Sequence, residues 1–316
     1  MALSRRSALR GLSTLGLAGL APTALASSFG DAPADHHMGH GGPHASFSIG
    51  DAKVTSILDA TFMLPTSAIG TNVSPDSVMA LLEARGLPTD SVPASVNVLM
   101  VEVGDRRILI DTGTGGPGTM AEGGMLMSTL KAIGVEPGDI DTVILSHWHG
   151  DHVGGAARDG KPAFPNATYH MSAREKAFLD NAPADNERVQ QAKQGLAPIM
   201  GGLQTYGDGD QVAPGIVAMA APGHTEGHFV FLLEVNGERL MLGSDTANHP
   251  VAFFERPEWL FGFDMLPEET VATRRKVLGR AADDKIPYWS THLPFPGVGA
   301  VSRDGAGFRF VPLPMM

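Results

Sequence analysis

The chain has 316 residues, of which 43% are hydrophobic and 18% are charged, so it can bury a substantial core and is not disordered as a whole. Its formal net charge of −11 argues against a nucleic-acid partner, because contacts to phosphates need clustered Lys and Arg. The chain contains no Cys, which excludes disulfides, thiolate metal sites and cysteine nucleophiles, and leaves His and carboxylates to hold any metal ion.

Residues 1–26 have the pattern of an export signal. The segment contains three arginines and no acid, an apolar run at 11–21, and a small-x-small ending at Ala26. The apolar run is too short to cross a membrane, so no stable membrane anchor is expected. The Arg5-Arg6 pair resembles a twin-arginine signal, which exports folded proteins. The segment therefore predicts a periplasmic or secreted protein, with an ordinary Sec signal as the alternative.

Residues 27–46 are rich in Gly, Ala, Pro and His and show no apolar periodicity, which predicts a flexible leader before a folded domain at 47–316. Four histidines lie in this leader, namely His36, His37, His40 and His44. Nothing in the pattern fixes their geometry, as a specific metal site requires. A periplasmic metal-binding protein that uses this leader is an alternative function, and deletion of residues 27–46 would then abolish metal binding.

From residue 47 onward, short apolar strands alternate with helical stretches, which predicts an α/β domain. Strands are predicted at 97–103, 108–111, 142–146, 216–220 and 229–235. Helices are predicted at 125–133, 172–179, 185–194 and 267–282. The second helix begins with a capping-box pattern, Ser172 followed by Glu175. The last helix has Glu early and Arg late, as the helix dipole favours.

Two segments of the predicted domain resemble each other. Each has the pattern of a strand, a tight turn and a second strand, followed by an Asp-Thr pair at Asp111-Thr112 or Asp245-Thr246. Two similar halves would place two sheets face to face with helices outside. Two unrelated hairpins with the same turn chemistry are the alternative.

A dense cluster of side chains that can bind metal follows the predicted strand 142–146. Three histidines and one aspartate lie close together in the sequence, namely His147, His149, Asp151 and His152. Further polar residues also follow apolar strands, namely His224, Asp245 and His292. Loops at one edge of a sheet would bring these residues to the first cluster. Imidazole and carboxylate ligands suit Zn²⁺, with Mn²⁺, Co²⁺ and Fe²⁺ as alternatives.

This His-x-His-x-Asp-His motif, combined with the later Gly-His, Asp and His, resembles the metallo-β-lactamase superfamily over residues 47–316. The resemblance implies an αβ/βα four-layer sandwich with the site at one edge of two packed sheets. It also implies two divalent metal ions, the first held by His147, His149 and His224 and the second by Asp151, His152 and His292. Asp245 would bridge the two ions, and Asp151 and Asp245 would be the catalytic residues.

Within the superfamily, the segments 165–168, 245–249 and 292–299 look like those of methyl parathion hydrolase and its relatives. This resemblance implies hydrolysis of small-molecule lactones, aryl esters or phosphotriesters by a hydroxide that bridges the two metal ions. Asp151 would also hold or move a proton. Because relatives are often dimers, a homodimer is expected as well.

Apolar side chains near the motif predict the walls of a substrate pocket. Trp148 lies between two expected ligands, and an aromatic-rich segment follows Asp245. The expected lining residues are Phe62, Trp148, His249, Phe253 and Phe254. Packing away from any substrate is the alternative for each of them. Asp111 is expected to support the metal ligands from behind.

A different chemistry is the remaining alternative. A superfamily member that resembles persulfide dioxygenase would use similar ligands around one iron ion and consume oxygen. Activity on β-lactams is disfavoured, because the second metal site would use Asp245 and the chain has no Cys.

Overall fold

The predicted α/β domain is confirmed by the computed structural model, which describes residues 42–116 and 122–313. These residues belong to the second of two units into which the chain divides, His36–Met316. The predicted signal at 1–26 and residues 27–41 of the predicted leader lie outside the described residues. None of the helices in the described ranges is long and apolar enough to cross a membrane.

The first sheet has eight strands, in the order β1-β2-β3-β4-β6-β9-β10, with β5 paired to β2. The strands are β1 His44–Ile49, β2 Ala52–Pro65, β3 Ser91–Val103, β4 Arg106–Ile110, β5 Glu122–Gly123, β6 Thr142–Leu145, β9 Thr168–Ser172 and β10 Gln204–Tyr206. Strands β4, β6, β9 and β10 run parallel to one another. Because parallel strands end at the same edge of a sheet, the loops after β4 and β6 lie near each other.

The second sheet has seven strands, in the order β11-β12-β13-β14-β15-β16-β17. They are β11 Gln211–Ala213, β12 Ile216–Ala220, β13 Phe229–Val235, β14 Glu238–Leu242, β15 Tyr288–Trp289, β16 Val298–Asp304 and β17 Gly307–Pro312. The hairpin β13–β14 is followed in the sheet by the parallel strand β15, just as the hairpin β3–β4 is followed by β6. The internal repeat is therefore present in the topology. A separate ribbon pairs β7 Ala157–Arg158 with β8 Lys161–Pro162.

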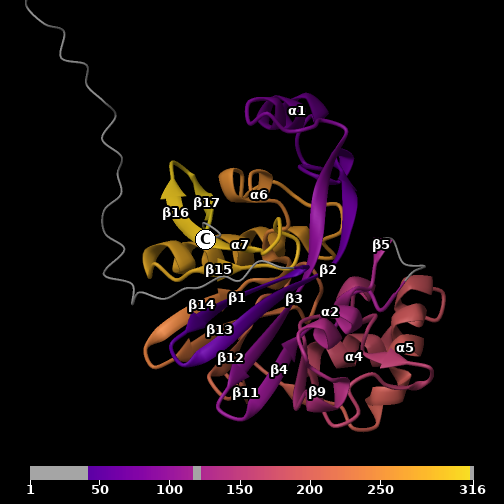
Figure 1. Ribbon diagram of the computed structural model, residues 1–316. Coiled ribbons are helices and arrows are strands. Elements are labelled where there is room, and N and C mark those ends of the chain that lie inside the picture. The colour runs from indigo at the N-terminus through magenta and orange to yellow at the C-terminus, as the bar shows by residue number, and fades with distance from the viewer. Residues whose placement is uncertain (1–41, 117–121, 314–316) are drawn as a thin grey trace, which may run out of the picture. The chain divides into compact units, whose positions relative to one another are not determined.

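Helices cover the outer faces of both sheets (Figure 1). The helices of the described residues are α1 Pro75–Glu83, at the end of the β2–β3 arm, α2 Leu126–Ala132, α3 Gly150–Val153, α4 Ala173–Asn181, α5 Glu187–Met200, α6 Ala252–Glu255 and α7 Pro267–Asp283, with 3₁₀ turns η1 Thr66–Ala68, η2 Pro137–Asp139 and η3 Ser244–Thr246. Of these, α2, α4, α5, α6 and α7 form the outer layers. One apolar cluster joins α2, α4 and α5 to the first sheet, another joins α6 and α7 to the second sheet, and a third lies between the sheets. The third includes Val101 and Ile110 of the first sheet with Phe231 and Leu242 of the second. These four layers are the predicted αβ/βα sandwich.

The predicted start of the domain at residue 47 is corrected by the structure. Strand β1 begins at His44, inside the predicted leader, and its side chains at Ala45, Phe47 and Ile49 are buried in alternation. This alternation of buried and less buried side chains is not evident from the sequence, because the strand is short and follows a segment rich in Gly, Pro and His. Strands β2 and β3 continue as a paired arm that leads to α1, and neither β2 nor α1 is among the predicted elements (Figure 1).

Candidate metal centre

A one-turn helix presents the central part of the motif. Strand β6 ends at Leu145, and α3 follows with His149 at its N-terminal cap. The amide and the hydroxyl of Thr112, in the loop after β4, donate to the carbonyl oxygen of His152 at 2.7 and 2.9 Å. A Cβ at Gly155 would overlap the carbonyl oxygen of Thr112, so only glycine allows this approach of the two loops.

The other candidate ligands follow strands of the second sheet. His224 lies between β12 and β13, Asp245 lies in η3 after β14, and His292 follows β15. The structure brings all seven predicted ligands together in three overlapping groups, in each of which the ligand atoms lie within 4.8 Å of one another. The groups are His147–His149–His224, His147–His152–Asp245 and Asp151–His152–His292.

The ligand atoms of each predicted set point at one another. Nδ1 of His149 lies 3.0 Å from Nε2 of His147 and 2.9 Å from Nε2 of His224. In the second set, Oδ2 of Asp151 lies 3.3 Å from Nε2 of His292. Facing nitrogen lone pairs at such distances repel each other unless a proton or a cation lies between them, so the arrangement favours positive charge.

Asp245 lies between the two sets. Its Oδ2 is 3.1 Å from Nε2 of both His224 and His292, and its Oδ1 is 3.2 Å from Nε2 of His152. Within the described part of the chain, Asp245 Oδ1 and His152 Nε2 are buried and have no hydrogen-bond partner. Burying polar atoms without hydrogen-bond partners costs free energy. A metal ion bound by both atoms would remove this cost. The donor set therefore fits divalent ions, and its imidazoles and carboxylates suit Zn²⁺.

Three of the imidazoles are oriented by groups behind them, which leaves Nε2 free to face the cluster. Nδ1 of His152 donates to Oδ2 of Asp111 at 2.8 Å, and Nδ1 of His224 donates to Oδ1 of Asp264 at 2.9 Å. Nδ1 of His292 donates to the carbonyl oxygen of Ser95 at 2.8 Å. The contact of Asp111 agrees with the supporting role expected from the sequence. Asp264 and Ser95 belong to no motif, and no sequence signal indicates that they lie beside ligands.

Burial and neighbouring charges shift the histidines of the cluster in opposite directions. Burial lowers the pKa of His149 to about 3 and that of His147 well below its usual value. Burial acts in the same direction on His224 and His292, but carboxylates led by Asp245 outweigh it and raise their pKa values to about 9 and about 10. Burial would raise the pKa of Asp245, yet the imidazoles led by His292 hold it well below its usual range. The carboxylates therefore favour protons or metal ions at these positions.

The raised pKa values of His224 and His292 predict that the metal-free protein loses stability at alkaline pH. Above pH 7 the folded state binds more protons than the unfolded state, in which His titrates near 6.5, so the free energy of unfolding should fall as the pH rises from 7 towards 10. Thermal unfolding of chelator-treated protein across this range measures the fall. In protein reloaded with Zn²⁺, the free energy of unfolding should fall less with pH, or should rise, because the metal ions replace the protons on the imidazoles. Equal slopes would contradict this arrangement of charges.

The predicted pocket residues fall into two groups. The Phe62 ring meets the His292 ring edge to face, with 5.5 Å between centroids, and the Trp148 ring lies 4.6 Å from that of His149. Phe253 and Phe254, in contrast, are fully buried in the core beside α7 and offer no surface to a substrate. The expectation that these two side chains line a pocket is corrected, because α6 turns both of them inward.

Two more rings of the segment after Asp245 lie on either side of α6 in the sequence, His249 before it and Phe261 after it. Nδ1 of His249 accepts hydrogen bonds from the amides of Val251 and Ala252 at 3.2 and 3.0 Å, so this predicted pocket residue also caps α6. Phe261 belongs to the aromatic-rich segment expected to line the pocket, and its ring stacks on that of His224 with 6.3 Å between centroids. The aromatic-rich segment after Asp245 indicates such a ring, but the sequence does not show which member faces the histidine.

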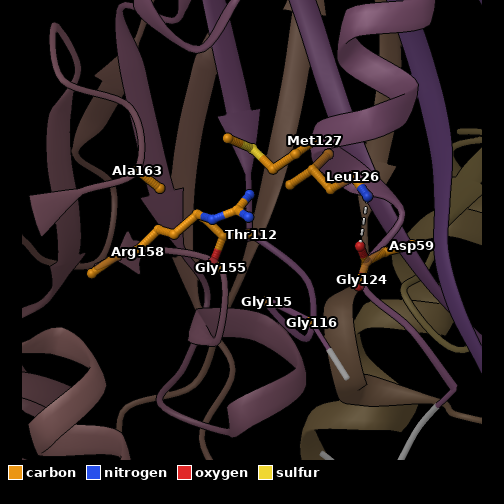
Figure 2. A pocket seen from close by; sticks show the side chains of 11 residues that line it. Asp59, Thr112, Gly115, Gly116, Gly124, Leu126, Met127, Gly155, Arg158 and Ala163 are labelled. Carbon is orange, nitrogen blue, oxygen red and sulfur yellow. Dashed lines mark hydrogen bonds between the residues drawn. The ribbon is translucent and has the colours of Figure 1, made fainter. Parts of the chain in front are cut away.

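A cavity of about 170 Å³ lies beside the end of the motif (Figure 2). Its lining includes Thr112, Met127, Gly155 and Arg158, and none of the seven candidate ligands contributes to it. Asp59, also in the lining, accepts a hydrogen bond from the amide of Leu126 at 2.8 Å, drawn dashed in Figure 2. This cavity is therefore distinct from the candidate metal centre.

Known sequences that are similar to this chain include hydrolases. A model of the metallo-beta-lactamase superfamily matches residues 91–287. The N-acyl homoserine lactonase of Bacillus cereus is 28% identical over 207 residues, which cover 64% of this chain and 78% of the lactonase. The atrochrysone carboxyl ACP thioesterase of Passalora fulva is 32% identical over 151 residues, which cover 48% of this chain but only 37% of the thioesterase.

Solved structures give the same result over nearly the whole domain. AidC, a dizinc quorum-quenching lactonase in complex with a product, is similar with a TM-score of 0.81 and 26% identity, over 89% of this chain and 100% of AidC. The hydrolase AbOPH of the beta lactamase superfamily is similar with a TM-score of 0.80 and 29% identity, over 87% of this chain and 99% of AbOPH.

Proposed function

The chain belongs to the metallo-β-lactamase superfamily, and we propose that it is an exported hydrolase that uses two divalent metal ions, preferably Zn²⁺, to cleave lactones and activated esters. The observation that carries the proposal is the position of Asp245 between His224 on one side and His152 and His292 on the other. The similarity to a dizinc lactonase and to an N-acyl homoserine lactonase supports lactones as the first substrate class. Aryl esters and phosphotriesters with good leaving groups are the further substrates.

Each part of the cluster has a role in this chemistry. His147, His149 and His224 would hold one ion, and Asp151, His152 and His292 the other, with Asp245 shared. Two bound divalent ions lower the pKa of a water molecule and polarise the reacting oxygen of the substrate.

Residues around the ligands would position the substrate and its protons. Asp151 is the most accessible carboxylate of the cluster, with a side chain 30% exposed. Burial would raise its pKa, but the imidazoles led by His152 hold it below the usual range, so the ionised carboxylate would pass a proton on near the leaving oxygen rather than store it. Phe62 and Trp148, which contact ligand rings, would exclude water from the reacting group.

A substrate panel tests the proposal. Metal-free protein and protein loaded with Zn²⁺, Mn²⁺ or Co²⁺ are assayed on an N-acyl homoserine lactone, an aryl acetate and a phosphotriester with an aryl leaving group. We expect hydrolysis only in the metal-loaded samples, fastest on the lactone or the aryl ester. Equal rates before and after chelation would contradict a metal-dependent hydrolase, and one iron per chain with oxygen uptake would favour the oxidative alternative.

Three further points rest on the sequence alone, namely export, the role of the leader and the homodimer. Export through residues 1–26 predicts mature protein that begins after Ala26, which N-terminal sequencing of secreted material measures. A metal carrier that uses the leader predicts loss of metal on deletion of residues 27–41, which stops short of β1 at His44. If the chain is a hydrolase, the deletion variant should keep a metal content and a turnover close to those of the full chain.

The homodimer stays a prediction, which light scattering measures.

A further inference from the structure

Glu175 is a fully buried carboxylate to which the proposed chemistry assigns no task. It lies in the first turn of α4, and its amide donates to Oγ of the capping residue Ser172 at 3.0 Å. The capping-box pattern predicts that the Glu side chain turns back to the amide of its own cap. In the structure the carboxylate instead accepts hydrogen bonds from two other segments of the chain.

The carboxylate of Glu175 joins two loops of the candidate metal centre. Its Oε1 accepts from the amide of Trp148 at 2.9 Å, and its Oε2 accepts from the amide of Gly227 at 2.8 Å. The hydroxyl of Thr225 lies 2.8 Å from Oε1 and 3.0 Å from Oε2. Trp148 stands between two ligands of the motif, and Thr225 directly follows His224. One side chain therefore holds the backbone beside all three ligands of the first predicted set.

The loop after His224 is packed against α4 with no room for adjustment. A Cβ at Gly227 would overlap the amide nitrogen of Glu175. The hydroxyl of Ser172 donates to the carbonyl oxygen of Gly227 at 2.7 Å. The start of α4 therefore binds both a donor and an acceptor of this loop, which leaves the loop one position relative to the helix.

We propose that Glu175 is a positioning residue for the metal centre, which sets the distance between the His147–His149 segment and His224 so that the three imidazoles reach one ion. The inference rests on the proposed function, because it needs a metal ion at this set. It goes beyond that function because it assigns the geometry of the set to a residue that cannot itself touch the ion. Besides the candidate ligands and Glu175, the two loops are joined at their other end, where the amide of Phe229 donates to the carbonyl oxygen of Ser146 at 3.3 Å.

The isosteric substitution Glu175→Gln is the main test. Gln has one oxygen and one amide group, so its amide nitrogen must face either the amide of Trp148 or the Thr225–Gly227 segment, and that contact becomes donor against donor. Thr225→Val removes only the hydroxyl donor and retains the shape. Glu226→Gln is the matched control, because its carboxylate lies in the same loop and takes part in no hydrogen bond or ion pair among the described residues.

The measurements are made on the full chain without substrate. Zn²⁺ competition with a chelator gives the number and affinity of bound ions, the visible absorption of Co²⁺-loaded protein reports ligand geometry, and thermal unfolding of metal-free protein reports stability. For Glu175→Gln we expect one ion to bind about 10–100-fold more weakly while the other is retained, as for removal of other groups that orient metal ligands. The Co²⁺ spectrum should change, Thr225→Val should act in the same direction more weakly, and Glu226→Gln should match the wild type.

Three results would overturn the inference. The first is a Glu175→Gln variant that unfolds at a lower temperature but binds both ions with unchanged affinity and an unchanged Co²⁺ spectrum. Glu175 would then have a purely structural role. If Glu175→Gln does not fold, unchanged affinity for both ions in Thr225→Val would reject the inference. Wild-type protein that binds no divalent metal would reject the proposed function together with this inference, whereas metal binding without hydrolysis of any substrate would reject only the proposed function.

Discussion

Asp245→Asn should remove one of two bound metal ions and lower the turnover of the preferred substrate by more than about 100-fold, because substitution of groups that only orient ligands already costs about 10–100-fold. Both oxygens of Asp245 face ligand nitrogens, Oδ1 that of His152 and Oδ2 those of His224 and His292. An amide in either place would point a donor at an atom that must bind a cation. Metal analysis by mass spectrometry together with steady-state kinetics measures both effects.

The matched control is Asp105→Asn, which makes the same chemical change at an exposed carboxylate. Asp105 is 94% exposed and lies 3.8 Å from Arg106, a separation at which the ion pair contributes little. This variant should keep the metal content and turnover of the wild type. Asp245→Asn with both ions and full turnover would show that Asp245 does not bridge two sites, and the dinuclear proposal would then fail.

Arg274→Met should lower the free energy of unfolding by about 3–5 kcal/mol, the range found when one partner of a buried ion pair is removed. The side chain of Arg274 is 1% exposed, and it donates to the carbonyl oxygens of Thr246, Pro257 and Trp259 at 2.7 to 3.0 Å. Its guanidinium also lies 3.6 Å from Asp264, which orients the ligand His224. Loss of Arg274 leaves three carbonyls and one carboxylate without their partner, so metal affinity should fall as well.

Arg275→Met is the control for this prediction, because the neighbouring arginine faces solvent. Arg275 is 44% exposed and pairs with Glu258 at 3.1 Å, so its replacement should change the free energy of unfolding by at most about 1 kcal/mol. Chemical denaturation of both variants, with and without Zn²⁺, measures the difference. Equal stability of the two variants would show that the buried contacts of Arg274 do not hold this part of the domain together.

The strands predicted at 216–220 and 229–235 have the same bounds in the structure, and the helix predicted at 267–282 is α7 with one more residue. These elements carry strong local signals, namely unbroken apolar runs between turn residues and Pro267 at the start of an amphipathic helix. α1 has such a signal in Ser74, whose side chain accepts from the amide of Ser77, yet it is not among the predicted elements. Its apolar face packs into the core only because the β2–β3 arm carries it there.

The sequence by itself determined the chemistry available to the site: which residue types are present, that no thiolate can take part, and that four of the candidate ligands are neighbours in one loop after a buried strand. Those facts depend on residues that are close in the chain, and the family pattern supplied the three distant ligands. Only the tertiary structure decided how the set is held. Glu175 meets Gly227 across 52 positions of the sequence and His292 meets Ser95 across 197, while Asp264 and Arg274 complete their ion pair inside the core. Such contacts form because two sheets pack face to face and bring the ends of their strands to one edge, which no local pattern of residues encodes.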